Sequence, residues 1–83
     1  MKATREQVYD AIDDERDYQE QRWERPAHNH SATEYLVYID HYVKKAFASV
    51  STEENELGAL DNLRKIAALA VAAMEEHGFI ERR

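Results

Sequence analysis

The stretch Ile66-Ala-Ala-Leu-Ala-Val-Ala-Ala-Met74 is an unbroken apolar run in a chain of 83 residues, 34% of which are charged. A helix that is apolar on every side is normally buried on every side. The run is too short to cross a bilayer, which takes roughly 20 residues. Its alanines would let neighbouring helices approach closely, while Leu69, Val71 and Met74 fill the gaps between them. We therefore expect this stretch to lie at the centre of an all-α helical bundle.

One chain of this length offers few neighbours for such a helix. At this size, folding removes only about 60% of the unfolded chain's surface from water. Small domains without cross-links often gain stability by association. The sequence contains no Cys, which excludes disulfides, thiolate metal sites and cysteine catalysis. We therefore predict one domain, residues 1–83, completed by further copies as a homodimer or a larger homo-oligomer.

The charge balance limits the partners of this domain. The net charge of −6 repels nucleic-acid phosphates at long range, so we do not expect DNA or RNA binding. The N-terminal residues lack the apolar run of a signal peptide or membrane anchor, so we expect no membrane association and a cytoplasmic location. The local basic pairs Lys44-Lys45 and Arg64-Lys65 still allow a small anion to bind in a pocket.

Three capping-box patterns predict three helix starts, because the side chains of such a pair satisfy two unpaired backbone N–H groups. The pairs are Thr4 with Gln7, Ser31 with Glu34, and Ser51 with Glu54. The first helix would end near Trp23 to Arg25, because Pro26 disfavours helical backbone in the residue before it. The second would begin at Ala32, and the third would run from near Thr52 to about His77.

Apolar residues recur at helical spacing on the first two of these helices. On the first they make a narrow stripe: Val8, Ile12, Tyr18 or Gln19, and Trp23. On the second they make a wide face: Tyr35, Leu36, Ile39, Tyr42 or Val43, Ala46, Phe47 and Val50.

Two glycines bear on the third predicted helix. Gly58 lowers helix propensity by about 1 kcal/mol relative to Ala, so a break into a fourth helix near Gly58 stays open. Gly78 is the expected C-terminal cap, with Phe79 and Ile80 folded back onto the helix end.

Two groups of side chains are candidates for ligand binding. Arg16, Gln19 and Trp23 share one side of the first helix and combine a planar cation, an amide and an aromatic ring, which could grip a nucleotide. Lys44, Lys45 and Lys65 place positive charge where a phosphate could be held. The alternative for these residues is structural: Trp23 in the core, and the cations paired with surrounding acids.

Metal-binding patterns are weak in this sequence. His28-Asn29-His30 supplies two imidazoles but no third ligand at a recognised spacing, so we interpret it as an ordinary loop and assign no metal ligand. Octahedral Mg²⁺ needs several oxygen ligands that converge on one point. The acids that remain as candidates for a catalytic site are Glu15, Asp40 and Asp61.

Several segments together resemble a known family. They are Glu15-Arg16-x-x-Gln19-x-x-x-Trp23, a His-containing loop, a Tyr-Leu-x-Tyr-Ile helix, and the Ala-rich segment from Leu63 to Glu75. This combination resembles the small MazG-like proteins of phages and prophages, which belong to the all-α nucleoside triphosphate pyrophosphohydrolases. The resemblance covers most of the chain and implies a helical bundle completed by dimerisation.

The catalytic signature of that family is incomplete here. It has a Glu-Glu-x-x-Glu run on the second helix and a Glu-x-x-Asp pair on the third, which bind magnesium. The comparable positions hold Ile39 to Lys44, with Asp40 as the one acid, and then Asn62 and Lys65. Since a lysine reverses the field that an acidic ligand provides, we expect binding of a nucleotide or related anion without hydrolysis.

Two other functions stay open at this point. The chain could be a pyrophosphohydrolase that holds Mg²⁺ at a non-standard site with Glu15, Asp40 and Asp61. It could instead be an interaction module that engages a host protein through Val37, Tyr38 and His41, which lie off the apolar face of the second predicted helix.

Overall fold

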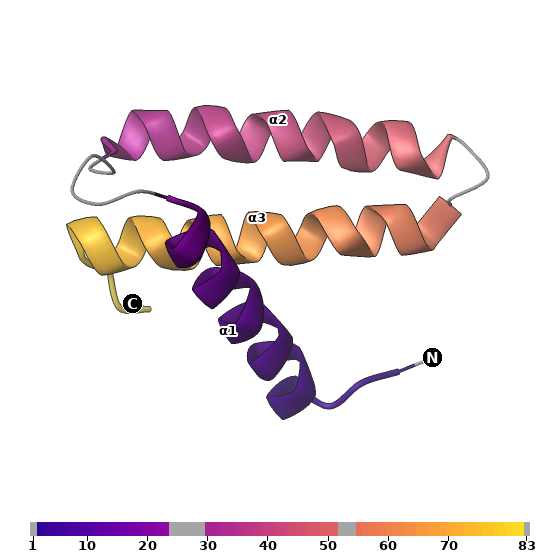
Figure 1. Cartoon of the computed structure of the whole chain (residues 1–83), viewed down its shortest axis with the longest axis horizontal. Helices are drawn as coiled ribbons and strands as arrows, with labels where there is room; N and C mark the ends of the chain where they lie inside the picture. Colours follow the sequence, from indigo (N-terminus) through magenta and orange to yellow (C-terminus); the bar gives the residue numbers. More distant parts are fainter. Residues whose placement is uncertain (1, 24–29, 52–54, 83) are drawn as a thin grey trace.

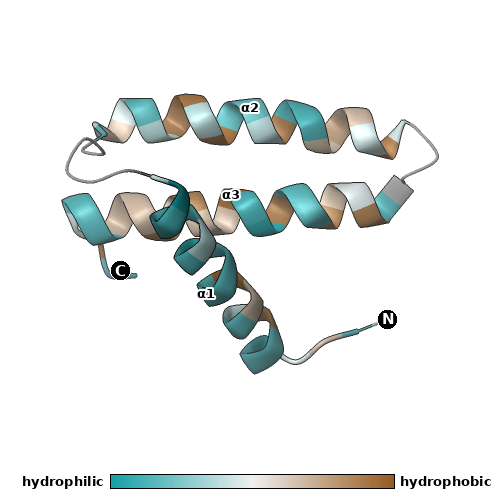
Figure 2. Ribbon diagram, in the orientation of Figure 1, coloured by the Kyte–Doolittle hydropathy of each residue, from teal (hydrophilic) through white to brown (hydrophobic). Residues whose placement is uncertain are grey.

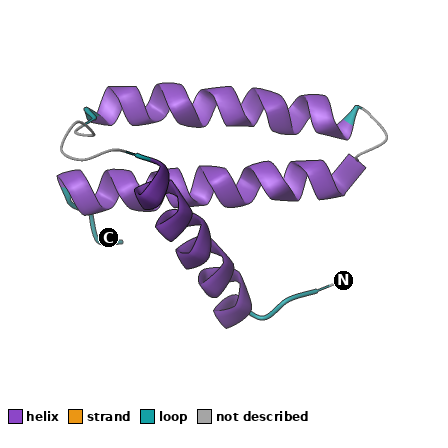
Figure 3. Ribbon diagram, in the orientation of Figure 1, coloured by secondary structure: helices purple, strands orange, loops and turns teal. Residues whose placement is uncertain are grey.

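The computed structural model describes residues 2–23, 30–51 and 55–82. These residues form three helices, α1 (Arg5–Arg22), α2 (Ala32–Val50) and α3 (Asn55–His77), and contain no strand (Figure 3). The predicted all-α bundle is therefore confirmed. Because α3 continues through Gly58 without interruption, the chain has no fourth helix at that point, and the alternative of a break is wrong.

The arrangement is an antiparallel pair with a third helix laid across it. Figure 1 shows α2 and α3 side by side and running in opposite directions, while α1 crosses α3 obliquely. The C-terminal end of α1 lies against α3, and its N-terminal end points away from the pair. Only part of α3 is therefore covered by α1.

The first two capping boxes form as the sequence predicts. Thr4 Oγ1 accepts from the backbone N–H of Gln7 at 3.1 Å, and the Gln7 side chain accepts from the Thr4 N–H at 2.9 Å. Ser31 and Glu34 repeat this pair at the start of α2, at 3.1 and 2.8 Å. These bonds fix the starts of α1 and α2 at the expected residues.

Ser51, from the third predicted capping box, lies at the end of α2. Ser51 is the C-cap of α2, and its hydroxyl donates to the carbonyl of Phe47 at 3.3 Å. Its predicted partner Glu54, and the predicted start near Thr52, lie outside the described residues, and α3 begins at Asn55. The serine that was expected to start α3 therefore closes the helix before it.

The end of α3 follows the prediction in part. Gly78 has a φ of 91° and donates its backbone N–H to the carbonyl of Met74 at 2.8 Å, which is the αL type of helix cap. Glycine suits this conformation because it has no Cβ to clash. Phe79 and Ile80 are exposed rather than folded back onto the helix, so that part of the prediction is wrong.

The core is small and is centred where the apolar run of α3 meets α2. Tyr35, Ala68, Leu69 and Ala72 are buried, and Trp23 is among the side chains packed around them. The run from Ile66 to Met74 is not buried on every side within one chain: Ile66 and Val71 are partly exposed and Met74 is 48% exposed. The reason is the oblique crossing of α1, which leaves the other sides of α3 uncovered.

The apolar faces of α1 and α2 differ in some residues from the predicted ones. On α1 the stripe passes through Gln19, which is buried, and not through Tyr18, which is exposed. On α2 the face is narrower than predicted, because Leu36, Phe47 and Val50 are exposed. Figure 2 shows that α1 is mostly hydrophilic, whereas hydrophobic residues recur along α2 and α3. No helix of the described residues is both long and apolar enough to cross a membrane.

Candidate functional site

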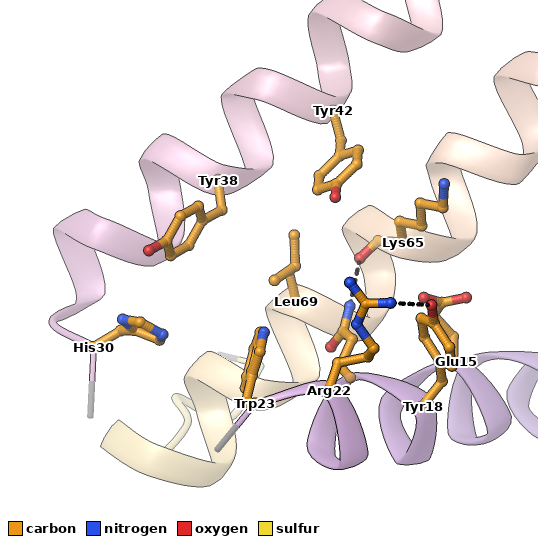
Figure 4. Close-up of a pocket in the computed structure, with 10 residues that line it drawn as sticks. Glu15, Tyr18, Arg22, Trp23, His30, Tyr38, Tyr42, Lys65 and Leu69 are labelled. Atoms are coloured by element: carbon orange, nitrogen blue, oxygen red, sulfur yellow. Dashed lines mark hydrogen bonds between the residues drawn. The ribbon is translucent and has the colours of Figure 1, made fainter. Parts of the chain in front are cut away.

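A pocket of about 510 Å³ opens where the C-terminal half of α1 meets α2 and α3 (Figure 4). This volume is typical of small-ligand sites, which measure roughly 300–1,000 Å³. Side chains from all three helices and from His30 line it: Glu15, Tyr18, Gln19, Arg22, Trp23, His30, Tyr38, Tyr42, Lys65 and Leu69. In Figure 4 the rings of Trp23, Tyr38 and Tyr42 lie around Leu69, whose side chain rises from α3.

Helical periodicity explains why α1 contributes four residues to this lining and its C-cap a fifth. Glu15, Tyr18 and Arg22 are three and four residues apart, and Gln19 and Trp23 are their neighbours on the same side. Residues at these spacings share one face of an α-helix. Trp23 is the C-cap of α1, and its backbone N–H donates to the Gln19 carbonyl at 3.0 Å. The end of the helix therefore fixes the position of the indole ring.

The imidazole of His30 lies at the centre of an aromatic cluster. Its ring centroid is 5.5 Å from that of Trp23, 5.4 Å from that of Tyr35 and 5.2 Å from that of Tyr38. All three contacts are edge-to-face, the arrangement that aromatic quadrupoles favour. These contacts join α1, the start of α2 and the segment before it into one wall of the pocket.

The end of α3 holds His30 in this place. The His30 backbone N–H donates to Glu76 Oε1 at 3.4 Å, and His77 Nε2 donates to the His30 carbonyl at 2.7 Å. Glu76 Oε1 also accepts from the hydroxyl of Tyr35 at 3.2 Å. The aromatic wall is therefore attached to the last turn of α3 through backbone and side-chain bonds.

Positive charge gathers at the opposite side of the pocket, around Tyr42. The Nζ atoms of Lys45 and Lys65 lie 5.4 and 5.7 Å from the centroid of its ring. Ammonium groups at this distance are attracted by the ring quadrupole. Lys65 is also 3.3 Å from Asp61, whereas Lys45 forms no ion pair within the described residues. Two cations therefore lie next to one aromatic ring, and Lys45 is the one without a carboxylate partner in the described part of the chain.

Arg22 adds a third cation on the α1 side. Its Nη1 donates to the hydroxyl of Tyr18 at 3.3 Å, and its guanidinium lies 5.8 Å from the Tyr18 ring centroid. Among the described residues no carboxylate pairs with it. A guanidinium can form two parallel bonds to a phosphate or carboxylate.

Gln19 is a buried polar residue in the wall of the pocket, 8% exposed. Its Nε2 donates weakly to the carbonyl of Lys65 at 3.5 Å, and its Oε1 accepts no hydrogen bond from the part of the chain that the structure describes. An acceptor buried without a partner costs about 1–3 kcal/mol. A bound N–H or O–H group would supply the missing donor.

Two linked ion pairs, which share Arg64, lie beside the pocket between α1 and α3. Arg64 Nε donates to Glu15 Oε1 at 2.8 Å, and Arg64 Nη2 donates to Asp61 Oδ1 at 2.6 Å. The Glu15 carboxylate, helped by Asp61, raises the pKa of Arg64. Arg64, followed by Lys65, in turn holds the pKa of Asp61 below its ordinary value. Both carboxylates are therefore bonded to the same guanidinium.

The predicted binding residues fall into three groups. Gln19, Trp23 and Lys65 line the pocket, and Lys45 lies beside it at Tyr42. Arg16 does not line it: its guanidinium lies 5.6 Å from the Trp23 ring and pairs with Glu20 and Glu75, both at 2.7 Å.

Lys44 lies away from this pocket. Its side chain is 76% exposed and bonds Asp40 at 2.8 Å, which raises the pKa of the lysine. Lys44 and Arg16 therefore fit the structural alternative, in which the cations pair with nearby acids, better than a role in binding a ligand.

The three candidate catalytic acids do not converge on one point. Glu15 and Asp61 meet at Arg64, whereas Asp40 pairs with Lys44 on α2. The described residues contain no group of three or more His, Cys, Asp or Glu side chains that could hold a metal. His28, from the His-Asn-His loop, lies outside those residues.

Sequence reasoning missed the pocket role of five residues, Tyr18, Arg22, His30, Tyr38 and Tyr42. A partial signal exists, because Tyr18 with Arg22 and Tyr38 with Tyr42 are each four residues apart and so share a helix face. Tyr38, predicted from the sequence to lie on a partner surface with Val37, also has its ring against His30 in the pocket wall, and Tyr38 and Val37 are both exposed. Comparisons of the chain with protein-family models, with curated proteins and with solved structures found no match.

Proposed function

We propose that this pocket binds a nucleotide, with the base against the aromatic wall and the phosphates at the lysines, and that the protein does not hydrolyse it. The observation that carries the proposal is the division of one pocket into an aromatic side at Trp23, His30 and Tyr38 and a cationic side at Lys65 and Lys45. A nucleotide has the same division between a flat ring and an anionic tail.

The aromatic side suits a nucleobase. Stacking of a base on an aromatic side chain contributes about 1–3 kcal/mol. Trp23 is partly exposed and Tyr38 is exposed, so their rings are accessible from the pocket. Gln19 Oε1, a buried acceptor without a partner in the described chain, would accept from an amino group of the base or a hydroxyl of the sugar.

The cationic side suits phosphate. Lys65 and Arg22 line the pocket and Lys45 lies beside it, so three positive groups surround one opening in a chain of net charge −6. Charge-assisted hydrogen bonds to phosphate are about twice as strong as neutral ones. A nucleotide is also the ligand class that the resemblance to MazG-like proteins implies.

The pairing of the acids supports binding without hydrolysis. Glu15 and Asp61 each bond Arg64, and Asp61 also pairs with Lys65. A magnesium ion at these carboxylates would have to displace both cations. The second candidate, a metal-dependent pyrophosphohydrolase, rests on Glu15, an acid that lines the pocket, with Asp61 next to it at Arg64.

Trp23 provides the experiment, because it is the only tryptophan of the chain and lies in the pocket wall. We expect ribo- or deoxynucleotides from a panel of mono-, di- and triphosphates to change its fluorescence in a saturable way. Lys65→Gln should weaken the binding of triphosphates by about tenfold, the value of one charge-assisted bond. Lys44→Gln is the matched control and should leave the affinity unchanged.

No saturable change with any nucleotide would refute the proposal. Pyrophosphate release in the presence of Mg²⁺ or Mn²⁺, measured on the same panel, separates the two candidates. Release that is lost in Asp61→Asn or Asp40→Ala would establish an enzyme and replace the proposal of binding without hydrolysis.

A further inference from the structure

Helix α1 is attached to the rest of the chain with little apolar packing. Gln19 is the one buried residue of α1, and its side chain is polar. Val8 is 45% exposed and Ile12 is partly exposed, while Trp23, the C-cap, packs against the core. The N-terminal end of α1 points away from α2 and α3 (Figure 1). Apolar contacts therefore hold the end of α1 but not its length.

Two ion pairs join α1 to α3. Arg16 Nε donates to Glu75 Oε1 at 2.7 Å, and Arg64 Nε donates to Glu15 Oε1 at 2.8 Å. The α1 member of each pair is largely shielded from water, since the Glu15 side chain is 10% exposed and the Arg16 side chain 14%. Solvent ions screen partly buried charges less than exposed ones. These two pairs are therefore the main attachment of α1 along its length.

The signs of the two pairs also define how α1 crosses α3. Glu15 and Arg16 are neighbours on α1, whereas Arg64 and Glu75 lie about three turns apart on α3, or about 16 Å along its axis. The acid on α1 meets the cation on α3, and the cation on α1 meets the acid. If α1 ran in the opposite direction, Glu15 would lie toward Glu75 and like charges would meet. The pairs therefore favour one docked position.

The same docked position leaves two buried polar atoms without a bond. Arg16 Nη1 and Gln19 Oε1 have no hydrogen-bond partner in the part of the chain that the structure describes. The hydrogen bond from Gln19 Nε2 to the Lys65 carbonyl is long, at 3.5 Å. Water would satisfy both atoms if α1 moved away, so their desolvation opposes docking. The position of α1 therefore depends on a balance in which the ion pairs are the favourable side.

The contact between α2 and α3 does not depend on α1. Its core is formed by Tyr35 of α2 with Leu69 and Ala72 of α3, and Ile39 packs against them. The Tyr35 hydroxyl also donates to Glu76 Oε1 at 3.2 Å. Salt screens ion pairs but does not weaken apolar burial. The two attachments therefore respond differently to salt.

We propose that α1 is a detachable wall of the pocket. It leaves α3 as a unit while α2 and α3 stay paired, and the ion pairs of Glu15 and Arg16 set the fraction of molecules in which it is docked. Cooperative openings of single elements are a general property of folded proteins. Since α1 and its C-cap supply five of the residues that line the pocket, the pocket is complete only while α1 is docked.

Glu75 is then a positioning residue for the pocket. It lies on α3, does not line the pocket and acts on it through Arg16. A ligand that touches α1 and α2 together binds the docked form alone and raises its population. That coupling rests on the proposed function, whereas the release of α1 does not.

The test is hydrogen–deuterium exchange of the full chain, followed by mass spectrometry in low salt and in about 1 M NaCl, where the Debye length is roughly 3 Å. We expect peptides from α1 of the wild type to exchange faster than those from α2 and α3. High salt should accelerate the exchange of α1 further, because it screens the attraction that holds the helix. Peptides from α2 and α3 are the internal reference and should change little.

Glu75→Arg should release α1, because it places a second cation beside Arg16. In low salt its α1 peptides should exchange at least about fivefold faster than those of the wild type, the value of one partly exposed ion pair. This acceleration should shrink in high salt, whereas a packing defect would persist. Glu81→Arg is the matched control, since it makes the same charge change where no ion pair exists within the described chain, and it should exchange like the wild type.

Glu75→Gln is the second variant, in case Glu75→Arg loses its helical circular dichroism spectrum. It removes the attraction without adding a cation, so it should give a smaller acceleration that also shrinks in high salt. Exchange of α1 in step with α2 and α3 at both salt concentrations would overturn the proposal. So would an acceleration by Glu75→Arg that persists in high salt, or one that Glu81→Arg reproduces.

The same measurement with nucleotides keeps this proposal apart from the proposed function. A nucleotide at about ten times its Kd should slow the exchange of α1 by about tenfold, because it binds the docked form alone. Salt-dependent release of α1 that no nucleotide of the panel slows would support the detachable wall and refute nucleotide binding in the pocket.

Discussion

Tyr35 Oη lies 3.2 Å from Glu76 Oε1, and this hydrogen bond joins the first turn of α2 to the last turn of α3. The same carboxylate oxygen accepts from the backbone N–H of His30. Burial of the ring, with the bond to Glu76, raises the pKa of Tyr35 above its ordinary value of 10.0. The neutral phenol therefore stabilises the fold below pH 10, and this contribution is lost as the pH rises through the folded-state pKa.

Tyr35→Phe should lower the free energy of unfolding by about 1 kcal/mol, the usual net value of one hydrogen bond. The ring remains, so packing in the core is kept. Urea denaturation at neutral pH measures the change. Tyr38→Phe is the control, since the hydroxyl of Tyr38 forms no hydrogen bond within the described chain. Equal losses in the two variants would contradict a role for the Tyr35–Glu76 bond.

Leu69→Ala should lower the free energy of unfolding by about 2–5 kcal/mol, because Leu69 is buried in the core and its truncation leaves a cavity. Leu36→Ala, at an exposed position, should change it by less than about 0.5 kcal/mol. Thermal or urea unfolding of both variants provides the comparison. A loss below about 0.5 kcal/mol for Leu69→Ala would show that the core has been misplaced.

Ser31→Ala should cost about 1 kcal/mol of stability, because the hydroxyl of Ser31 accepts from the backbone N–H of Glu34 at the start of α2. Ser31→Asp supplies another acceptor at the cap and should retain most of that stability. Chemical denaturation distinguishes the two. If both substitutions cost the same, the cap does not stabilise α2 through this bond.

Asp61→Asn should remove a pH-dependent part of the stability. Arg64 holds the pKa of Asp61 below its ordinary value of 3.8. A carboxyl group with a depressed pKa stabilises the fold above its unfolded pKa, and this contribution is lost as the pH falls through the folded pKa. Since Asp61 is nearly half exposed, the contribution at neutral pH should not exceed about 1 kcal/mol.

Urea midpoints of the wild type and Asp61→Asn, measured from pH 7 downwards, test this dependence. The difference between them should close below pH 3.8, where the carboxylate becomes protonated. In an Arg64→Gln background the difference at pH 7 should shrink, because the main partner of Asp61 is gone. A difference that stays constant with pH would exclude the ion pair as its cause.

Gln19→Leu should separate stability from binding. The substitution removes a buried acceptor that has no partner in the described chain, so the free energy of unfolding should stay the same or rise. The same change should weaken nucleotide binding by about tenfold, because a bound donor loses its acceptor. Unfolding and Trp23 fluorescence titrations measure the two effects, and unchanged affinity would remove Gln19 from the proposed site.

Local sequence signals predict the helices of this protein well. The hydrogen bonds of the Thr4 and Ser31 capping boxes are made within one turn, so the starts of α1 and α2 can be read from a few neighbouring residues. Gly78 marks the end of α3 for the same reason, since only its own backbone conformation is involved. Ser51 shows the limit of such signals, because its hydroxyl can cap either of two adjoining helices and here closes α2.

The candidate site was only partly predictable. Gln19, Trp23 and Lys65 were selected for their chemistry and do line the pocket. Arg16 and Lys44 have the same chemistry but bond acids instead. Which cation meets an acid, and which faces an opening, depends on the angle between helices and not on residue type.

The sequence by itself determined the all-α class, the extent of the first two helices and the apolar run that supplies Leu69 to the core, because these depend on bonds and periodicity within a single helix. Only the tertiary structure decided that α1 crosses α3 obliquely (Figure 1). That crossing brings Trp23 to His30, opens the pocket and leaves leucines in the N-terminal half of α3 exposed. It depends on how side chains of separate helices fit together, which no local pattern of the chain encodes.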